Sequence, residues 1–205
     1  MEKIIIVSIH PMRMSSESRE DERTLSRNSE NFVSWYSYLS RNQGALVELI
    51  SELRKVLPGY DSFYRKEAGE ATVLKVMFEP QGGKGKLLSY DFNELSDGQR
   101  VLIVLYSLLL GLKNEGVSLF LDEPDNFVTL REIQPWLIAL TDSCGESVEQ
   151  AVLISHHPEI IDRLALQSGR WFDRDNNGPT RVSDTPKAQV DGLTPSESMA
   201  RGWQS

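Results

Sequence analysis

Two adjacent carboxylates follow a short apolar run in this 205-residue sequence. Residues 117–121 (VSLFL) lead directly into Asp122 and Glu123. A carboxylate at the end of a buried strand can hold Mg²⁺, often through water, and a neighbouring acid can deprotonate an attacking water, typically worth about 10²- to 10⁴-fold in rate. Acidic residues also occur at the ends of strands simply because the chain reaches solvent and begins a turn there. The pair alone therefore leaves a metal site and an ordinary strand end equally open.

A second apolar run, residues 151–154 (AVLI), is followed by the sequence S-H-H-P. A histidine beside the acid pair could contact a phosphate, although an isolated histidine is more often a hydrogen-bonded core residue. Adjacent side chains on an extended chain point in opposite directions, so His156 and His157 rarely bind one zinc ion together. His10 is the only other histidine, and the single Cys144 has no partner at ligand spacing, so zinc is not expected.

The sequence S-D-G-Q stands at the start of an apolar helical pattern that extends from about residue 98 to residue 112. Ser96 and Gln99 match the S-x-x-Q capping box, in which the serine caps the helix and the glutamine bonds back. A capping box does not explain Gly98, because glycine is a poor helix former that permits a close approach to the backbone. Free N–H groups at a helix N-terminus attract anions. The alternative to a simple cap is thus a phosphate-binding turn that contains Ser96, Gly98 and Gln99.

The elements before this turn are a strand, two helices and a hairpin. A buried strand is expected at residues 4–9, followed by a polar, exposed loop and by helical patterns at 32–39 and 46–57. Residues 71–79 alternate like a strand, and residues 87–92 suit the returning strand of the same hairpin.

After the turn, short apolar strands alternate with helices. The strands are expected at 117–121 and 151–154, with a helix at about 132–143 between them that has Pro135 in its first turn. A short helix with Ile160, Ile161 and Leu164 facing inward should follow the second strand. This alternation predicts a parallel sheet buried on both faces, and ligands gather at the carboxyl ends of such strands.

The chain divides on these patterns into three segments. Residues 1–95 hold the first strand, the helical pair and the hairpin; residues 96–168 hold the alternating strands and helices. Residues 169–205 suggest a hairpin that turns at Asn177-Gly178 and a final short helix.

Composition narrows the class of protein. The net charge of −8 argues against a chain that coats nucleic acid by itself, because phosphate binding needs a basic surface. The longest apolar run, VLIVLYSLLLGL, is shorter than the roughly 20 residues that cross a bilayer, and the N-terminus lacks the features of a secretory signal. A single cysteine suits a reducing compartment. We therefore expect a globular, cytoplasmic protein with no membrane partner.

The order of the motifs is more specific than any one of them. L-S-D-G-Q before a helix, an apolar strand ending in D-E-P, a helix, and an apolar strand ending in S-H-H-P together resemble the back half of an ABC-type ATPase over residues 90–165. The variants DEPDNF and SHHPEIID look most like the RecF/SMC-related bacterial ATPases called AAA_21 or overcoming-lysogenization-defect-like. Several members of that group serve DNA repair or anti-phage defence beside a nuclease.

This resemblance implies a role for each matching residue. Asp122 would be the Mg²⁺-associated acid of Walker B, Glu123 the general base and His156 the γ-phosphate sensor. Ser96 and Gly98, with Gln99 in the same signature motif, would contact ATP held by a second protomer. Asp125 and Asn126 lie where the family has its D-loop, a loop that contacts the other protomer. The resemblance is less specific at these two residues than at the motif residues.

One motif of that family is missing from the sequence. G-x-x-x-x-G-K-[ST] does not occur, since the Gly-Lys pairs at 83–84 and 85–86 are followed by Gly85 and Leu87. We therefore expect an α/β, partial P-loop NTPase fold without the Walker A portion, completed by a second ATPase protomer or a Walker A-bearing chain, with ATP and Mg²⁺ as cofactors. A fragment of a longer ATPase, one half of a split enzyme and a degenerate relative are the explanations, in that order of preference. The alternative function is a non-hydrolysing dimerisation or regulatory module that docks on an ATPase or nuclease.

Overall fold

The computed structural model describes residues 3–113, 115–174, 177–184 and 192–202. The chain forms two compact units, Met1–Ile154 and Ser155–Ser205. These bounds differ from those of the three segments expected from the sequence, 1–95, 96–168 and 169–205. Of the helices in the described ranges, none has both the length and the apolar character needed to cross a membrane.

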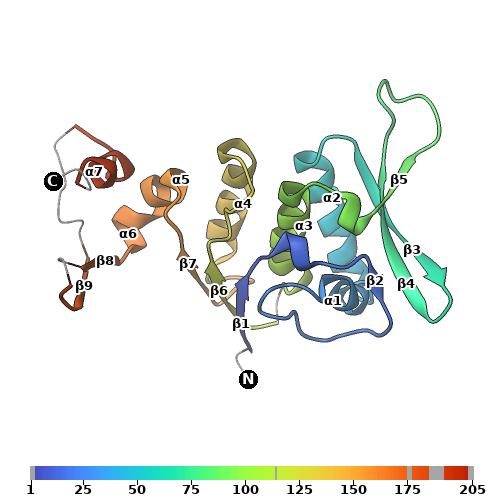
Figure 1. Ribbon diagram of the computed structural model, residues 1–205, viewed down its shortest axis with the longest axis horizontal. Coiled ribbons are helices and arrows are strands. Elements are labelled where there is room, and N and C mark those ends of the chain that lie inside the picture. The colour runs from blue at the N-terminus through green and yellow to red at the C-terminus, as the bar shows by residue number, and fades with distance from the viewer. Residues whose placement is uncertain (1–2, 114, 175–176, 185–191, 203–205) are drawn as a thin grey trace. The chain divides into compact units, whose positions relative to one another are not determined.

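The first unit contains a sheet of three parallel strands, in the order β1 (Lys3–Ser8), β6 (Val117–Asp122) and β7 (Gln150–Ile154) (Figure 1). In the register of this sheet, Asp122 lies between Ser8 on β1 and Ile154 on β7. The N-terminal strand therefore pairs with a strand more than a hundred residues later, so the segments 1–95 and 96–168 share one sheet. An α/β architecture with a parallel sheet and flanking helices is confirmed.

The two faces of this sheet are buried to different extents, and the prediction of burial on both faces is wrong for the outer strands β1 and β7. On the buried face, Ile5, Val7, Leu119 and Leu121 are at most 8% exposed. On the opposite face, Ile4, Ile6, Val152 and Ile154 are 64%, 54%, 40% and 62% exposed. We call this second face the open face. An apolar run indicates that both faces of a strand tolerate burial. Both faces are buried only if a layer of helices covers each of them.

Two long helices lie on the buried side of the sheet and contact each other, α3 (Asp97–Gly111) and α4 (Leu130–Ser143). α3 also contacts α1 (Phe32–Leu39) and α2 (Gln43–Val56), which explains why its residues 101–105 are fully buried. α4 begins earlier than predicted because Thr129 and Glu132 form a capping box. Pro135 consequently lies inside the helix rather than in its first turn, which corrects that expectation.

A second, antiparallel sheet is built around β4 (Ala71–Phe78). β4 pairs with β5 (Leu88–Asp91), which confirms the predicted hairpin, and also with β3 (Tyr60–Ala68) and the short β2 (Glu17–Ser18). Aromatic rings join α1 to this sheet and to the turn after β5. Tyr36 lies 4.7 Å from Phe63 on β3, and Phe32 stacks on Phe92, which follows β5, with a centroid separation of 4.9 Å.

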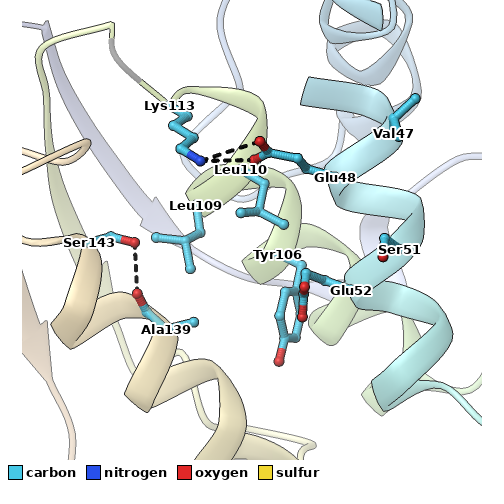
Figure 2. A pocket seen from close by; sticks show the side chains of 10 residues that line it. All are labelled: Val47, Glu48, Ser51, Glu52, Tyr106, Leu109, Leu110, Lys113, Ala139 and Ser143. Atoms are coloured by element: carbon cyan, nitrogen blue, oxygen red, sulfur yellow. Dashed lines mark hydrogen bonds and ion pairs between the residues drawn. The ribbon is translucent and has the colours of Figure 1, made fainter. Parts of the chain in front are cut away.

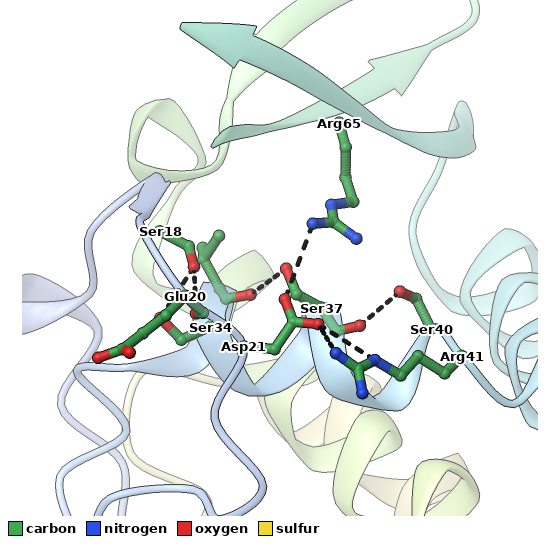
Figure 3. A network of polar contacts seen from close by, with 9 residues as sticks. Ser18, Glu20, Asp21, Ser34, Ser37, Ser40, Arg41 and Arg65 are labelled. Carbon is green, nitrogen blue, oxygen red and sulfur yellow. Dashed lines mark hydrogen bonds and ion pairs between the residues drawn. The ribbon is translucent and has the colours of Figure 1, made fainter. Parts of the chain in front are cut away.

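The polar segment after β1 was predicted to be an exposed loop, but hydrogen bonds fasten part of it to α1 (Figure 3). The Ser18 hydroxyl donates to the Glu20 carbonyl oxygen at 2.7 Å and accepts from the Ser34 hydroxyl at 3.0 Å. The Asp21 carboxylate forms an ion pair with Arg41. Ser18 is buried as a result, so the prediction of exposure is wrong for this part of the loop.

The second unit begins with a helical stretch made of α5 (Pro158–Ile160), a π-helical turn (Ile161–Ala165) and α6 (Leu166–Ser168). The predicted hairpin is present as β8 (Trp171–Arg174) and β9 (Thr180–Ser183), and the predicted final helix as α7 (Pro195–Gly202). The Asp162 carboxylate accepts hydrogen bonds from the Ser196 N–H and hydroxyl, both at 2.8 Å. Of the expected segment 169–205, residues 175–176, 185–191 and 203–205 lie outside the described residues.

Candidate functional site

The predicted acid pair lies at the carboxyl end of β6, the central strand of the parallel sheet. Both side chains are partly exposed. Because side chains alternate along a strand and Asp122 pairs with Ile154, Asp122 belongs to the open face. Glu123 leaves the strand with a φ of 47°, a left-handed conformation that is uncommon for a residue other than glycine. Its N–H donates to the Ile154 carbonyl at 2.7 Å, and its carboxylate accepts from the Asn126 amide at 2.7 Å.

The loop after Glu123 reverses the chain within a few residues. The Asn126 N–H donates to the Glu123 carbonyl at 3.2 Å, and the Val128 N–H donates to the Asp125 carbonyl at 3.1 Å. Phe127 is also left-handed, with a φ of 72°. Strained backbone of this kind costs about 1–3 kcal/mol per residue and is concentrated at functional sites. Asp125 is buried and Asn126 is exposed.

The S-D-G-Q turn forms the capping box that the sequence predicts. The Ser96 hydroxyl accepts from the Gln99 N–H at 3.3 Å, and the Gln99 side-chain oxygen accepts from the Ser96 N–H at 3.0 Å. Ser96 is exposed at the N-terminus of the buried helix α3. The capping interpretation is confirmed for Ser96 and Gln99, and their contact with a phosphate stays a prediction.

Gly98 joins this turn to the loop after the acid pair. A Cβ atom at Gly98 would lie 2.7 Å from the Phe127 carbonyl oxygen, closer than Cβ atoms approach other atoms in folded proteins. The group that approaches Gly98 closely is therefore a carbonyl of the chain itself. This contact accounts for glycine at position 98 without a ligand, and it brings two of the three predicted motifs side by side.

Arg100 is a site residue that the sequence analysis missed. It is 8% exposed, forms an ion pair with Asp97, and donates a hydrogen bond to the Pro11 carbonyl oxygen. Its Nε has no hydrogen-bond partner among the described residues. The i, i+3 spacing of Asp97 and Arg100 is the signal that could have identified the pair. Arg100 thus fastens the S-D-G-Q turn to the segment that follows β1.

A polar cleft of about 560 Å³ lies beside Asp122 at the carboxyl ends of β1 and β6. It is also lined by Ser8, His10, Arg27, Asn28 and Glu30. Within the described ranges, no group of three or more histidine, cysteine or acidic side chains could hold a metal alone. Mg²⁺ usually takes one or two carboxylates and completes its shell with water and substrate phosphates. Asp122 fits that donor set only together with a phosphate ligand.

The predicted histidines have different environments in the second unit. His157 caps α5, because its Nδ1 accepts from the Glu159 N–H at 3.2 Å. His156 is exposed, so the alternative of a buried core histidine is wrong. His156 is described within the second unit alone, whereas Asp122 and Glu123 belong to the first.

A groove of about 530 Å³ lies between α2, α3 and α4, and Figure 2 shows the side chains that line it. Glu48 on α2 pairs with Lys113 just beyond α3 at 3.0 Å, and the Ser143 hydroxyl donates to the Ala139 carbonyl at 2.7 Å. Burial raises the pKa of Tyr106, which also lines the groove, to about 12. None of the predicted site residues lines it.

A scan of the sequence against models of known protein families finds no match, and a search of curated proteins finds none either.

The first unit therefore combines an exposed serine at a helix N-terminus, two acids at the end of the central strand, and a polar cleft. A helix N-terminus and a hydroxyl donate to anions, whereas the carboxylates bind cations or accept protons. The set is suited to a ligand that carries both signs of charge, such as a metal–phosphate complex.

Proposed function

We propose that this chain supplies the signature, Walker B and switch-histidine portion of an ABC-type ATPase of the RecF/SMC-related group. It hydrolyses ATP with Mg²⁺ only when a Walker A segment from elsewhere completes the site. The contact between Gly98 and the Phe127 carbonyl oxygen carries the proposal. Through it, the S-D-G-Q turn and the loop after Asp122 and Glu123 become one local structure at the carboxyl end of a parallel sheet.

Each residue has a role in this proposal that its chemistry allows. Asp122 would hold Mg²⁺, which neutralises phosphate charge when bound. Glu123 orients the attacking water and accepts its proton. The Ser96 hydroxyl, exposed at the N-terminus of α3, donates to a phosphate oxygen of ATP bound by a second protomer. His156 contacts the γ-phosphate and reports its presence.

Two features support this assignment beyond the motif order. Glu123 keeps a left-handed backbone, which a strand end does not require and which glycine would adopt at lower cost. Ser96 is exposed, so a neighbouring protomer can reach its hydroxyl. A setting in DNA repair or anti-phage defence, with a nuclease or DNA as partner, is part of the proposal through the resemblance alone.

The second candidate function is a non-hydrolysing dimerisation or regulatory module that docks on an ATPase or nuclease. The sequence lacks G-x-x-x-x-G-K-[ST], which favours it. The retained Glu123 and the exposed His156 favour hydrolysis, because a docking module has no chemical need for either.

The test compares ATP hydrolysis by the chain alone and after addition of a polypeptide that carries G-x-x-x-x-G-K-[ST]. We expect turnover only in the mixture. Glu123→Gln should lower that turnover by at least about 100-fold and retain nucleotide binding, because the amide cannot accept the proton. Glu70→Gln, in the exposed turn between β3 and β4, is the matched control and should leave turnover unchanged.

Two results would contradict the proposal. One is rapid Mg²⁺-dependent hydrolysis by the 205-residue chain alone, which would remove the need for a partner. The other is unchanged turnover in the Glu123→Gln mixture, which would remove the general base.

A further inference from the structure

The groove between α2, α3 and α4 is a second concave surface of the first unit. Its volume of about 530 Å³ lies within the range of about 300–1,000 Å³ that ligand pockets have. All three helices belong to the first unit, so the groove is complete within that unit. None of the residues proposed for ATP hydrolysis lines it. The groove is therefore a binding surface that the proposed function does not use.

The floor of the groove is apolar and elongated. α3 contributes Leu109 and Leu110, and the lining extends along the chain from Tyr106 to Lys113, which is roughly 10 Å of helix. Val47 on α2, which also lines the groove, is 67% exposed. This length of about two helical turns suits a partner helix, whose apolar side chains at i, i+3 or i+4, and i+7 fill such grooves.

Tyr106 brings a polar atom to this apolar floor. The residue is only 2% exposed, and within the described ranges its hydroxyl has no hydrogen-bond partner. Burial, and to a lesser extent the neighbouring Glu52 carboxylate, raise the pKa of Tyr106 to about 12, so the phenol keeps its proton at neutral pH. A largely buried hydroxyl without a partner is unfavourable, and a ligand group that bonds to it would remove that penalty.

The carboxylate beside this hydroxyl is held only weakly by the chain itself. Glu52 forms an ion pair with Lys55 on the same helix at 2.6 Å, and the two side chains are 37% and 64% exposed. Exposed pairs of this kind contribute little to stability, so another cation can replace Lys55. Figure 2 shows Glu52 and Tyr106 on the α2 side of the groove. Together they offer two oxygen acceptors to one donor group.

Acidic residues also predominate where α4 ends. Asp142 precedes the groove residue Ser143, and Glu146 follows it in the next turn. Both acids are exposed, and neither forms an ion pair with another residue in the part of the chain that the structure describes. Lys113 is already paired with Glu48 at 3.0 Å. The charges around the groove therefore favour a cationic occupant.

We propose that this groove binds an amphipathic helix of a partner protein through an arginine side chain. The guanidinium donates one N–H to the Glu52 carboxylate and another to the Tyr106 phenol oxygen, which its planar fork of donors permits. Apolar side chains on the same face of the partner helix pack on Leu109 and Leu110. The inference goes beyond the proposed ATPase activity and does not depend on it.

A second copy of this chain is a less suitable occupant. Each copy carries a net charge of −8, and like charges at an interface oppose association. The basic, apolar helix that the groove requires is therefore expected from a different chain.

The single cysteine of the chain provides the assay. Cys144 is exposed and directly follows the groove residue Ser143, so an environment-sensitive dye attached to it reports occupation of the groove. The probe is a stapled helical peptide with leucine at i, i+4 and i+7 and arginine at i+3, since a short helix does not form alone. The control peptide has citrulline in place of arginine. We expect saturable binding of the arginine peptide and at least about tenfold weaker binding of the citrulline peptide.

Substitutions identify the side chains that bind the arginine. Glu52→Gln should weaken binding of the arginine peptide by at least about tenfold and change that of the citrulline peptide much less, so that the two changes are coupled. Glu70→Gln removes the same charge in the exposed turn between β3 and β4 and should leave both affinities unchanged. Tyr106→Phe keeps the ring, loses the hydroxyl and should weaken binding of the arginine peptide about three- to tenfold.

The absence of saturable binding at millimolar peptide would overturn the inference, as would equal affinities of the arginine and citrulline peptides. Equal weakening by Glu52→Gln and Glu70→Gln would overturn it too, because the peptide would then respond only to the net charge of the chain. Self-association that Glu52→Gln abolishes would assign the groove to a second copy instead. An unchanged affinity in Tyr106→Phe would remove the proposed contact with the phenol.

Discussion

Replacing Gly98 with alanine tests the contact on which the proposed function rests. Gly98 and Gly44 are both the second residue of a helix, α3 and α2 respectively, so the same substitution can be compared at both. At Gly44 the nearest atom to a new Cβ is the Asn42 Oδ1 at 3.6 Å, an ordinary contact. At Gly98 it is the Phe127 carbonyl oxygen at 2.7 Å.

The two substitutions should change stability in opposite directions. Alanine is better than glycine in a helix by about 0.5–1 kcal/mol, and Gly44→Ala should gain this amount. At position 98 the clash with a backbone carbonyl costs about 1–3 kcal/mol, as overpacked cores do. Subtracting the helix gain leaves a net loss of about 0–2.5 kcal/mol for Gly98→Ala.

Urea unfolding followed by tryptophan fluorescence measures this difference in the first unit, where Trp35 and Trp136 are fully buried. With an m-value of about 2 kcal/mol per molar urea, the midpoint should fall by up to about 1.2 M for Gly98→Ala and rise by about 0.3–0.5 M for Gly44→Ala. A rise for Gly98→Ala as large as that for Gly44→Ala would refute the close approach of Phe127. The S-D-G-Q turn and the loop after Glu123 would then not form one structure.

Asp97→Ala should destabilise the first unit by about 1.5–3 kcal/mol, because the buried Arg100 would lose its charged partner. Asp61→Ala, which removes an exposed ion pair with Arg54, should cost at most about 1 kcal/mol, and equal losses in urea unfolding would contradict the role of Arg100. Burial raises the pKa of Tyr106 to about 12, above its ordinary value of about 10. Between pH of about 10 and about 12, the unfolded chain therefore loses the Tyr106 proton while the folded protein keeps it. Stability should therefore be intact below pH of about 10 and fall as the pH rises towards about 12; Tyr106→Phe should make this fall shallower, and identical slopes would refute it.

Apolar periodicity predicted the elements that hold the site, since each depends on local residue order. β6, β7 and α3 lie within one or two residues of their expected bounds. β3 was missed because YDSFYRKEA is rich in charged residues, and this strand forms by pairing with β4 across a tight turn. The start of α4 was misplaced because the capping box of Thr129 and Glu132 was not recognised.

Long-range contacts explain the remaining differences at the site. The sequence marks Gly98 as a position of close approach, but it does not reveal that the approaching group is the Phe127 carbonyl oxygen. Arg100 is buried because it bonds to Pro11, 89 positions earlier in the chain. The open face was not predicted either, because an apolar run such as IIIVSI gives the same pattern whether one or two layers cover the strand.

The uncovered sheet also has a consequence for how a cell could maintain this polypeptide. Ile6, Val152 and Ile154 are exposed on this face, where they can contact other nascent chains. Chaperones and proteases act on such surfaces, so polar substitutions at these three positions should raise the steady-state level of the protein in a cell.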